Sequence, residues 1–181
     1  MAFITYKQLT GKVQTFSQEN NLRKSAETSA GKTVFLSHST KDHTYVPGVI
    51  ELFRENGAST YVDDGDKRLP SSPDHTTANI LKQTIKQCPR FVVLVSPNSY
   101  SSRWIPWELG LADAYKTVAP IAVLPIAPTS SEESWAKTEY LGLYPRIVCA
   151  LEGQSYTYSV YDPRTNQIRW TLNQWLSQSV S

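Results

Sequence analysis

Short apolar runs alternate with longer amphipathic segments through most of the chain. Four runs are almost entirely hydrophobic, as in strands that are buried on both faces of a sheet; they span residues 34–36, 91–95, 121–124 and 147–151. A weaker strand is expected at residues 60–62, and apolar residues recur at helical spacing between the runs. This alternation predicts an α/β fold, in which helices cover both faces of a five-stranded parallel sheet. We expect the flavodoxin-like strand order 2-1-3-4-5.

The N-terminal segment has a different pattern. Residues 1–31 are mostly polar, but Leu9, Val13 and Phe16 recur at helical spacing. They predict a short leading helix that docks on the main body, followed by a linker over residues 25–31. We therefore expect residues 1–31 to form a leader that is separate from the main domain.

The C-terminal part of the chain also departs from the strand and helix alternation. Apolar and polar residues alternate over two segments, one on each side of Asp162-Pro163, which predicts an antiparallel hairpin. A short helix is expected to follow near the end of the chain. The main domain, residues 32–181, would then consist of a core over residues 32–151 and a hairpin and helix extension over residues 152–181.

Composition and charge narrow the class of protein. A length of 181 residues suits one well-buried domain. No apolar run is long enough to cross a bilayer, and the first residues are too polar for an export signal, so we expect a cytoplasmic protein without membrane contacts. With 18 basic and 16 acidic residues, the chain has no dense positive charge for nucleic acid. Cys88 and Cys149 lack CxxC spacing and are expected to be free buried thiols.

Polar residues gather in the loops that follow the predicted strands. In an open parallel sheet, ligands bind beyond the carboxyl ends of the strands. The loops at residues 37–42, 63–68 and 96–100 are unusually polar, and we expect them to line one pocket. The three histidines lack the spacing of a metal site, and no glycine-rich phosphate-binding motif occurs. We therefore expect neither a bound metal nor a cofactor.

One acidic residue lies on the apolar side of the helix predicted after the third strand. Turning about 100° per residue, this helix places Glu108 within an arc that includes Trp107, Leu111 and Ala112. A carboxylate there must be neutral, have a buried partner or open onto a pocket, because burying an unpaired charge is costly. The last arrangement would make Glu108 a functional residue.

Two simpler interpretations of this helix remain open. Pro106 suits the first turn of a helix, so Glu108 would then complement the positive end of the helix dipole. Trp104 would then be an ordinary core aromatic residue. Helical periodicity alone does not separate these interpretations from a functional site.

Two segments resemble the conserved motifs of Toll/interleukin-1 receptor (TIR) domains. The sequence Phe-Leu-Ser-His-Ser-Thr-Lys-Asp at residues 35–42 is similar to their first conserved box. Ser-Arg-Trp at residues 102–104, followed by Glu-Leu at residues 108–109, is similar to their S-x-W…E-L motif. The two motifs occur in the family's order, and the resemblance covers roughly residues 32–151.

The resemblance implies a set of site residues. In enzymatic TIR domains the motif glutamate is the catalytic residue, and this role corresponds to Glu108 here. The substrate-binding residues that the resemblance implies are Ser37 and His38 at the nicotinamide–ribose end, Asp63 or Asp64 at the start of the second-strand loop, and Trp104 in the pocket wall. Two positions differ from familiar family sequences: Ile105 replaces a cysteine, and Leu-Pro-Ser at residues 69–71 replaces a proline-glycine pair.

The activity that the resemblance implies is cleavage of the nicotinamide–ribose bond of NAD+, which would be a substrate and not a cofactor. The products would be nicotinamide and either ADP-ribose or a cyclic ADP-ribose isomer that acts as a signal. Similarity to bacterial TIR proteins, such as those of Thoeris anti-phage systems, further implies a role in phage defence and self-association through TIR–TIR contacts. The alternatives are a non-catalytic adaptor that binds other TIR domains and a bacterial effector that disturbs host TIR signalling.

Overall fold

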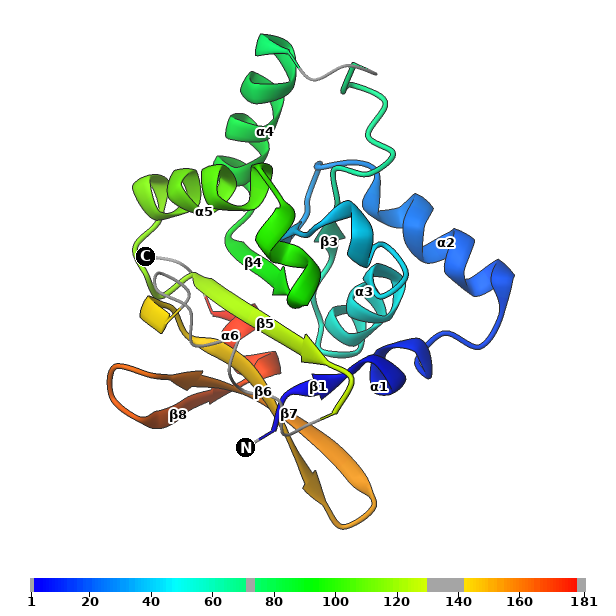
Figure 1. Cartoon of the computed structure of the whole chain (residues 1–181), viewed down its shortest axis with the longest axis vertical. Coiled ribbons are helices and arrows are strands. Elements are labelled where there is room, and N and C mark those ends of the chain that lie inside the picture. The colour runs from blue at the N-terminus through cyan, green and yellow to red at the C-terminus, as the bar shows by residue number, and fades with distance from the viewer. Residues whose placement is uncertain (1, 71–73, 130–141, 179–181) are drawn as a thin grey trace.

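A computed structural model describes residues 2–70, 74–129 and 142–178 (Figure 1). The strands in chain order are β1 (Ile4–Thr5), β2 (Val34–Ser37), β3 (Thr60–Tyr61), β4 (Arg90–Val95), β5 (Ile121–Ala127), β6 (Arg146–Glu152), β7 (Ser155–Asp162) and β8 (Gln167–Thr171). The helices are α1 (Tyr6–Thr10), α2 (Phe16–Ala26), α3 (Val46–Glu55), α4 (His75–Gln87), α5 (Trp104–Tyr115) and α6 (Leu172–Ser177), with 3-10 turns η1 (Thr40–Asp42) and η2 (Pro97–Ser101).

The strands form one mixed sheet in the order β3-β2-β4-β5-β6-β7-β8. Neighbours from β3 to β6 are parallel, whereas β6, β7 and β8 pair antiparallel. The predicted α/β class with a mainly parallel sheet is therefore confirmed. The sheet is wider than the five strands that we expected, because β7 and β8 continue it beyond β6 and β1 pairs with β5.

Helices cover both faces of the sheet (Figure 1), and alternate residues of each central strand enter opposite cores. In β4, Phe91 and Val93 pack with residues of α4 and α5, whereas Val92 and Leu94 pack with residues of α2, α3 and α6. Successive side chains of a strand point to opposite faces, so a strand covered on both sides is apolar throughout. This burial explains the continuous hydrophobic runs in the sequence.

The N-terminal segment is part of the sheet, which differs from the expected helical leader. Strand β1 pairs parallel with the end of β5 at Ile4 and Ile126, and Ala2 forms a bridge with Cys149 of β6. The segment therefore fills the gap where β5 and β6 diverge beyond Val123. A strand of two residues is too short to produce a recognisable sequence pattern.

The helices of this segment also differ from the prediction. The chain forms two helices with a break between them, and Leu9 is buried in α1 whereas Phe16 begins α2 with 78% of its surface exposed. Helix α1 packs so closely on α3 that a Cβ at Gly48 would lie only 2.2 Å from the Leu9 carbonyl oxygen. Helix α2 extends to Ala26, into the expected linker. A domain boundary at residue 31 stays a prediction.

Candidate functional site

Glu108 lies in a buried position at the carboxyl end of the central strands. It is the fifth residue of α5, and its neighbours on the buried side of this helix include Ile105, Leu109 and Ala112. Only 3% of the Glu108 surface is exposed. The hydroxyl of Ser37, the last residue of β2, donates a 2.5 Å hydrogen bond to Oε2 of Glu108. The tertiary fold thus joins the two sequence motifs through one short contact.

The surroundings of Glu108 disfavour its negative charge. Burial raises the pKa of Glu108 to about 8, the negative charge of Asp63 acts in the same direction, and the hydrogen bond from Ser37 opposes both. Among the described residues, no lysine, arginine or histidine forms an ion pair with this carboxyl group. The carboxyl group of the free protein is therefore mainly protonated at neutral pH.

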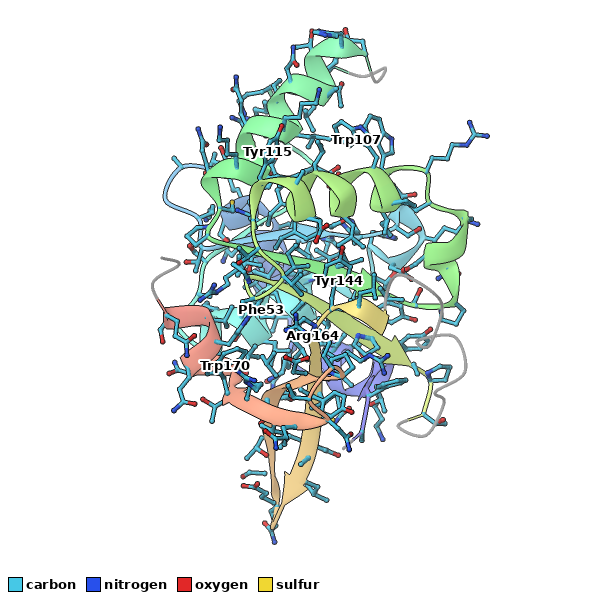
Figure 2. All side chains as sticks on the ribbon, turned by 90° about the vertical axis from the view of Figure 1, so that its left-hand side faces the viewer. Phe53, Trp107, Tyr115, Tyr144, Arg164 and Trp170 are labelled. Carbon is cyan, nitrogen blue, oxygen red and sulfur yellow. The ribbon has the colours of Figure 1, made fainter. Side chains whose placement is uncertain are left out.

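The two simpler interpretations of α5 are wrong. No acidic residue lies in the first turn of the helix, so Glu108 does not serve as an exposed charge at the helix N-terminus. Trp104 begins the helix with 37% of its surface exposed, and its ring meets that of Trp107 edge to face with 5.3 Å between the centroids. Figure 2 shows Trp107 and Tyr115 on the side of α5 that faces away from the sheet.

His38 and Asp63 form a second polar contact beside this carboxyl group. Nδ1 of His38 lies 4.0 Å from Oδ1 of Asp63, and this nitrogen is buried without a hydrogen-bond partner. His38 directly follows β2 and Asp63 lies two residues beyond the end of the neighbouring strand β3, which explains why they meet. Burial lowers the pKa of His38, and the charges of Asp63, Asp64 and Asp42 oppose this shift. Burial likewise raises the pKa of Asp63, and the charge of His38 opposes it.

The structure does not bring all the predicted site residues to one place. Asp64 is exposed and lines a small hollow with Val62 and Ile50, on the face of the sheet that α3 covers. The residues that the structure does gather are Ser37, His38, Asp63 and Glu108. Trp104 stands one helical turn before Glu108. These positions agree with the expectation that polar loops meet at the carboxyl edge of the sheet.

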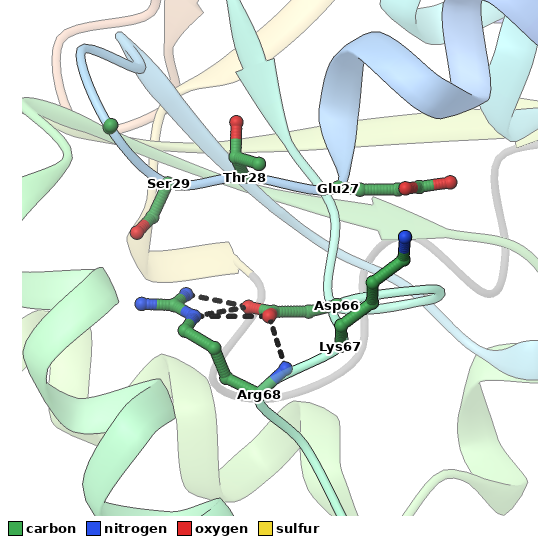
Figure 3. A pocket seen from close by; sticks show the side chains of 7 residues that line it. Glu27, Thr28, Ser29, Asp66, Lys67 and Arg68 are labelled. Atoms are coloured by element: carbon green, nitrogen blue, oxygen red, sulfur yellow. Dashed lines mark hydrogen bonds and ion pairs between the residues drawn. The ribbon is translucent and has the colours of Figure 1, made fainter.

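Four grooves lined by described residues lie away from Glu108. One of about 360 Å³ runs between the segment after α2 and the loop after β3 (Figure 3). Its lining includes Asp66, whose carboxylate is held by the guanidinium group of Arg68. The loop at residues 63–68 thus lines a groove with the N-terminal segment, which the sequence did not predict.

A buried cluster next to the site joins two of the polar loops, although the sequence analysis assigned no site role to its residues. Asp42 at the end of η1 accepts hydrogen bonds from the side chains of Ser96 and Asn98, which belong to the connection between β4 and α5. The available signal was the position of Asp42 at the end of the first TIR-like box. Short polar residues in loops have no periodicity, so the sequence did not reveal this contact.

Within the described ranges, no group of three or more acidic, histidine or cysteine side chains is placed to hold a metal ion.

The TIR domain family model matches residues 34–146, which is more than half of the chain. The chain therefore belongs to the TIR domain family, as its two motifs predicted. No helix in the described parts of the chain has the length and apolar character that a membrane span needs.

Two curated relatives narrow the comparison within this family. The chain is 39% identical over 116 residues to a protein of Bacillus cereus (strain MSX-D12) that is named as a probable 3′ cyclic ADP-D-ribose synthase, ThsB′. It is also 33% identical over 79 residues to a Cytobacillus dafuensis protein, TIR2, that is provisionally named as a cyclic ADP-D-ribose synthase. The first match covers 63% of this chain and 59% of the relative, and the second covers 42% and 21%.

Proposed function

We propose that this chain cleaves the bond between nicotinamide and ribose in NAD+, with Glu108 as the catalytic residue. The observation that carries the proposal is a buried carboxyl group without a cationic partner, held by Ser37 at the edge of the sheet where α/β proteins bind ligands. The names of the two relatives support the same chemistry. The match spans only part of each relative, so the activity is proposed from the site together with these names.

The reaction requires a negative charge more than it requires an acid. The nicotinamide of NAD+ is a pyridinium cation, so when the bond to C1′ of ribose breaks, the ring nitrogen keeps the electron pair and neutral nicotinamide leaves. Positive charge then develops on the ribose, and a fixed carboxylate stabilises it, as in glycosidases. Water captures the sugar cation to give ADP-ribose and a proton, or a nucleophilic group of the same molecule captures it and loses its proton to give a cyclic ADP-ribose.

Substrate binding supplies the positive charge that the Glu108 carboxyl group lacks as a partner in the free protein. A nearby positive charge favours the ionised form of a carboxyl group. The pyridinium ring of bound NAD+ therefore lowers the pKa of Glu108, and the proton passes to solvent before the bond breaks. Ser37 occupies Oε2 of the carboxylate, which leaves Oε1 to receive the ribose hydroxyl groups.

The other predicted residues have supporting roles in this proposal. His38 and Asp63 line the nicotinamide–ribose end of the site, next to Glu108. The half-exposed ring of Trp104 holds the flat nicotinamide and excludes water. Asp64 takes part only if the loop after β3 changes its conformation, because it now lines the opposite side. NAD+ serves as the substrate, and no separate cofactor is needed.

We further propose that the protein acts in anti-phage defence and that copies associate through TIR–TIR contacts. The first relative is named for the synthesis of a cyclic nucleotide, 3′ cyclic ADP-D-ribose. A small diffusible nucleotide can serve as a signal, which supports the proposed role in defence. Light scattering over a range of protein concentrations, with and without NAD+, tests the association. The cytoplasmic location and the absence of nucleic-acid binding stay predictions.

The proposed activity is tested by incubating the purified protein with NAD+ and measuring nicotinamide by chromatography. Glu108→Gln should reduce release by about 10³-fold, whereas Glu152→Gln, at an exposed glutamate of β6, should leave it unchanged. Equal release by wild type and Glu108→Gln would remove Glu108 from its role. Mass spectrometry of the second product separates hydrolysis from cyclisation, because ADP-ribose is heavier than a cyclic ADP-ribose by one water.

A wild-type protein that releases no nicotinamide, even at concentrations where light scattering shows association, would overturn the enzymatic proposal. The non-catalytic adaptor would then remain, since the TIR fold alone supports binding to other TIR domains. The buried, unpaired position of Glu108 favours the enzyme, because an adaptor has no use for a carboxyl group that its fold keeps from the surface.

A further inference from the structure

Asp42 is a fully buried carboxylate that no cation neutralises among the described residues. Asp42 is the last residue of η1, which lies shortly after Ser37 at the end of β2 and the adjacent His38. Burying such a group costs free energy unless hydrogen bonds replace its hydration. Its partners therefore indicate what the fold gains by keeping it there.

The partners of Asp42 come from the connection that leads to Glu108. The Ser96 hydroxyl lies 2.8 Å from Oδ1 and 2.7 Å from Oδ2, and Nδ2 of Asn98 donates to Oδ1 at 2.8 Å. The Ser96 hydroxyl also accepts a hydrogen bond from the backbone N–H of Asn98 at 3.0 Å. Asp42 thus organises the start of η2 as well as binding to it.

These hydrogen bonds join the two halves of the proposed site. One segment runs from Ser37 at the end of β2 through His38 to Asp42. The other begins at Ser96 and continues through η2 into α5, which contains Trp104 and Glu108. A second contact connects the same loops at the surface, where Nζ of Lys41 donates to the Ser101 hydroxyl at 3.1 Å. The Asp42 cluster is the buried part of this connection.

We propose that Asp42 is a positioning residue for NAD+ cleavage. It holds the segment from Ser37 to Asp42 against the turn that leads to Glu108. The proposal rests on the proposed function. Asp42 does not touch the reacting atoms; it fixes the register between the group that binds the Glu108 carboxylate and the helix that presents it. A displacement of about 1 Å between reacting groups lowers a rate by about 100-fold.

Asp42→Asn tests this role with little change in shape. The amide keeps one oxygen acceptor but turns an N–H toward the Ser96 hydroxyl. The oxygen of this hydroxyl already accepts a hydrogen bond from the backbone N–H of Asn98. We expect kcat to fall about 10- to 100-fold and KM to change less than about threefold, because misalignment affects the transition state more than substrate binding. Asn98→Ala removes one donor and should reduce kcat by a smaller factor.

A double-mutant cycle separates the connection from independent effects. The variant with both Asp42→Asn and Asn98→Ala should be no slower than Asp42→Asn alone, because both changes break the same contact. Additive losses would mean that the two residues act separately and would overturn the proposal. Asp162→Asn is the matched control, since it also alters a buried aspartate but lies at the end of β7, far from Glu108 in the sheet order.

Hydrogen exchange gives a readout that does not depend on activity. In Asp42→Asn, backbone amides at residues 37–43 and 96–102 should exchange faster while those of β6 and β7 stay protected. Exchange that rises throughout the chain would assign Asp42 to general stability and overturn the positioning role, and Asn98→Ala provides the same test if Asp42→Asn does not fold. If wild type cleaves NAD+ and Asp42→Asn has the same kcat, this proposal fails while the proposed function stands. If wild type releases no nicotinamide, both fail.

Discussion

Buried carboxylates occur in two kinds of surroundings in this protein. In the turn after β3 and in the turn that begins at the end of β7, Asp66 and Asp162 are each paired with an arginine two residues later. At the carboxyl edge of the sheet, Asp42 and Glu108 have no ion pair with a cation among the described residues. All four side chains are almost completely buried, so their partners and not their depth distinguish them.

The two turns have the same local geometry. The backbone N–H of Arg68 donates to Asp66 and that of Arg164 donates to Asp162, at 2.9 and 3.0 Å, and each guanidinium group then binds the same carboxylate. Burial raises the pKa of Asp66, but the hydrogen bonds from Arg68 and Tyr61 outweigh it and leave the pKa below its ordinary value. The hydrogen bond from Arg164 lowers the pKa of Asp162 in the same way.

The contrast with Glu108 separates the structural carboxyl groups from the one that we propose to be catalytic. Arginine pairs keep the two turn aspartates charged, which favours a single fixed conformation. Glu108 has a pKa raised to about 8, so its charge becomes favourable only when a cation arrives. The pyridinium ring of NAD+, the substrate that we propose, would supply such a cation, so this region is better suited than the turns to the proposed chemistry.

The largest expected effect separates activity from stability at Glu108. Glu108→Gln should reduce nicotinamide release by about 10³-fold, the scale of losing a main electrostatic group. Its melting temperature should stay the same or rise, because a neutral amide replaces a carboxyl group that is already mainly protonated. Thermal melting and initial rates at pH 7 check both parts. A large loss of stability would class Glu108 with the turn aspartates.

The second effect is the dependence of activity on pH. Below pH 8, kcat/KM should rise roughly tenfold per pH unit as free Glu108 ionises, and should then level off. Asp63→Asn removes a negative charge that disfavours ionisation, so the rise should move to lower pH. Initial rates from pH 5.5 to 9.5 at low NAD+ measure this. A profile that is flat over this range in wild type would contradict the raised pKa.

The third effect is an opposite pH dependence of stability in the two regions. Glu108 binds its proton more tightly in the folded state, so its contribution to the free energy of unfolding is complete below the unfolded pKa. Above that pKa the contribution declines by up to about 1.4 kcal/mol per pH unit, until the pH passes about 8. The contribution of Asp162, whose folded pKa is lowered, is present above its unfolded pKa and is lost at more acidic pH. Urea unfolding of wild type, Glu108→Gln and Asp162→Asn at several pH values should show both trends, and parallel trends would remove the distinction.

A related comparison measures the arginine pair directly. At pH 7, Asp162→Asn should lower the free energy of unfolding by about 1–2 kcal/mol, because charged hydrogen bonds to a half-exposed arginine are lost. Nicotinamide release per folded molecule should not change. A fall in kcat would connect the C-terminal hairpin to the site.

The smallest effect concerns the hydrogen bond at Glu108 itself. Ser37→Ala removes a donor that favours the ionised carboxylate, so the pKa of Glu108 should rise further and the activity profile should move to higher pH. At pH 7 we expect a loss of about tenfold, the scale of one buried hydrogen bond. Ser177→Ala, at the exposed end of α6, is the control and should behave as wild type.

The amino-acid sequence alone determined the class of fold and the position of the main candidate. Strands covered on both faces must be apolar throughout, and this requirement is visible in β4 and β5 without any structure. Helical periodicity indicated that Glu108 is buried, although the arc that it predicted through Trp107 and Leu111 is not the buried side of α5, and two motifs in the correct order identified the family. These signals are local or periodic, so they can be recognised in the sequence without a structure.

Only the tertiary structure decided what surrounds Glu108. Ser37 lies 71 positions away in the chain, and no periodic pattern connects the two residues. The same is true of Asp42 with Ser96 and of β1 with β5, where contacts depend on how loops and strand ends meet in space. A protonation state depends on every charge and dipole nearby, so whether a buried acid is paired, as Asp162 is, or unpaired, as Glu108 is, follows from packing and not from residue type.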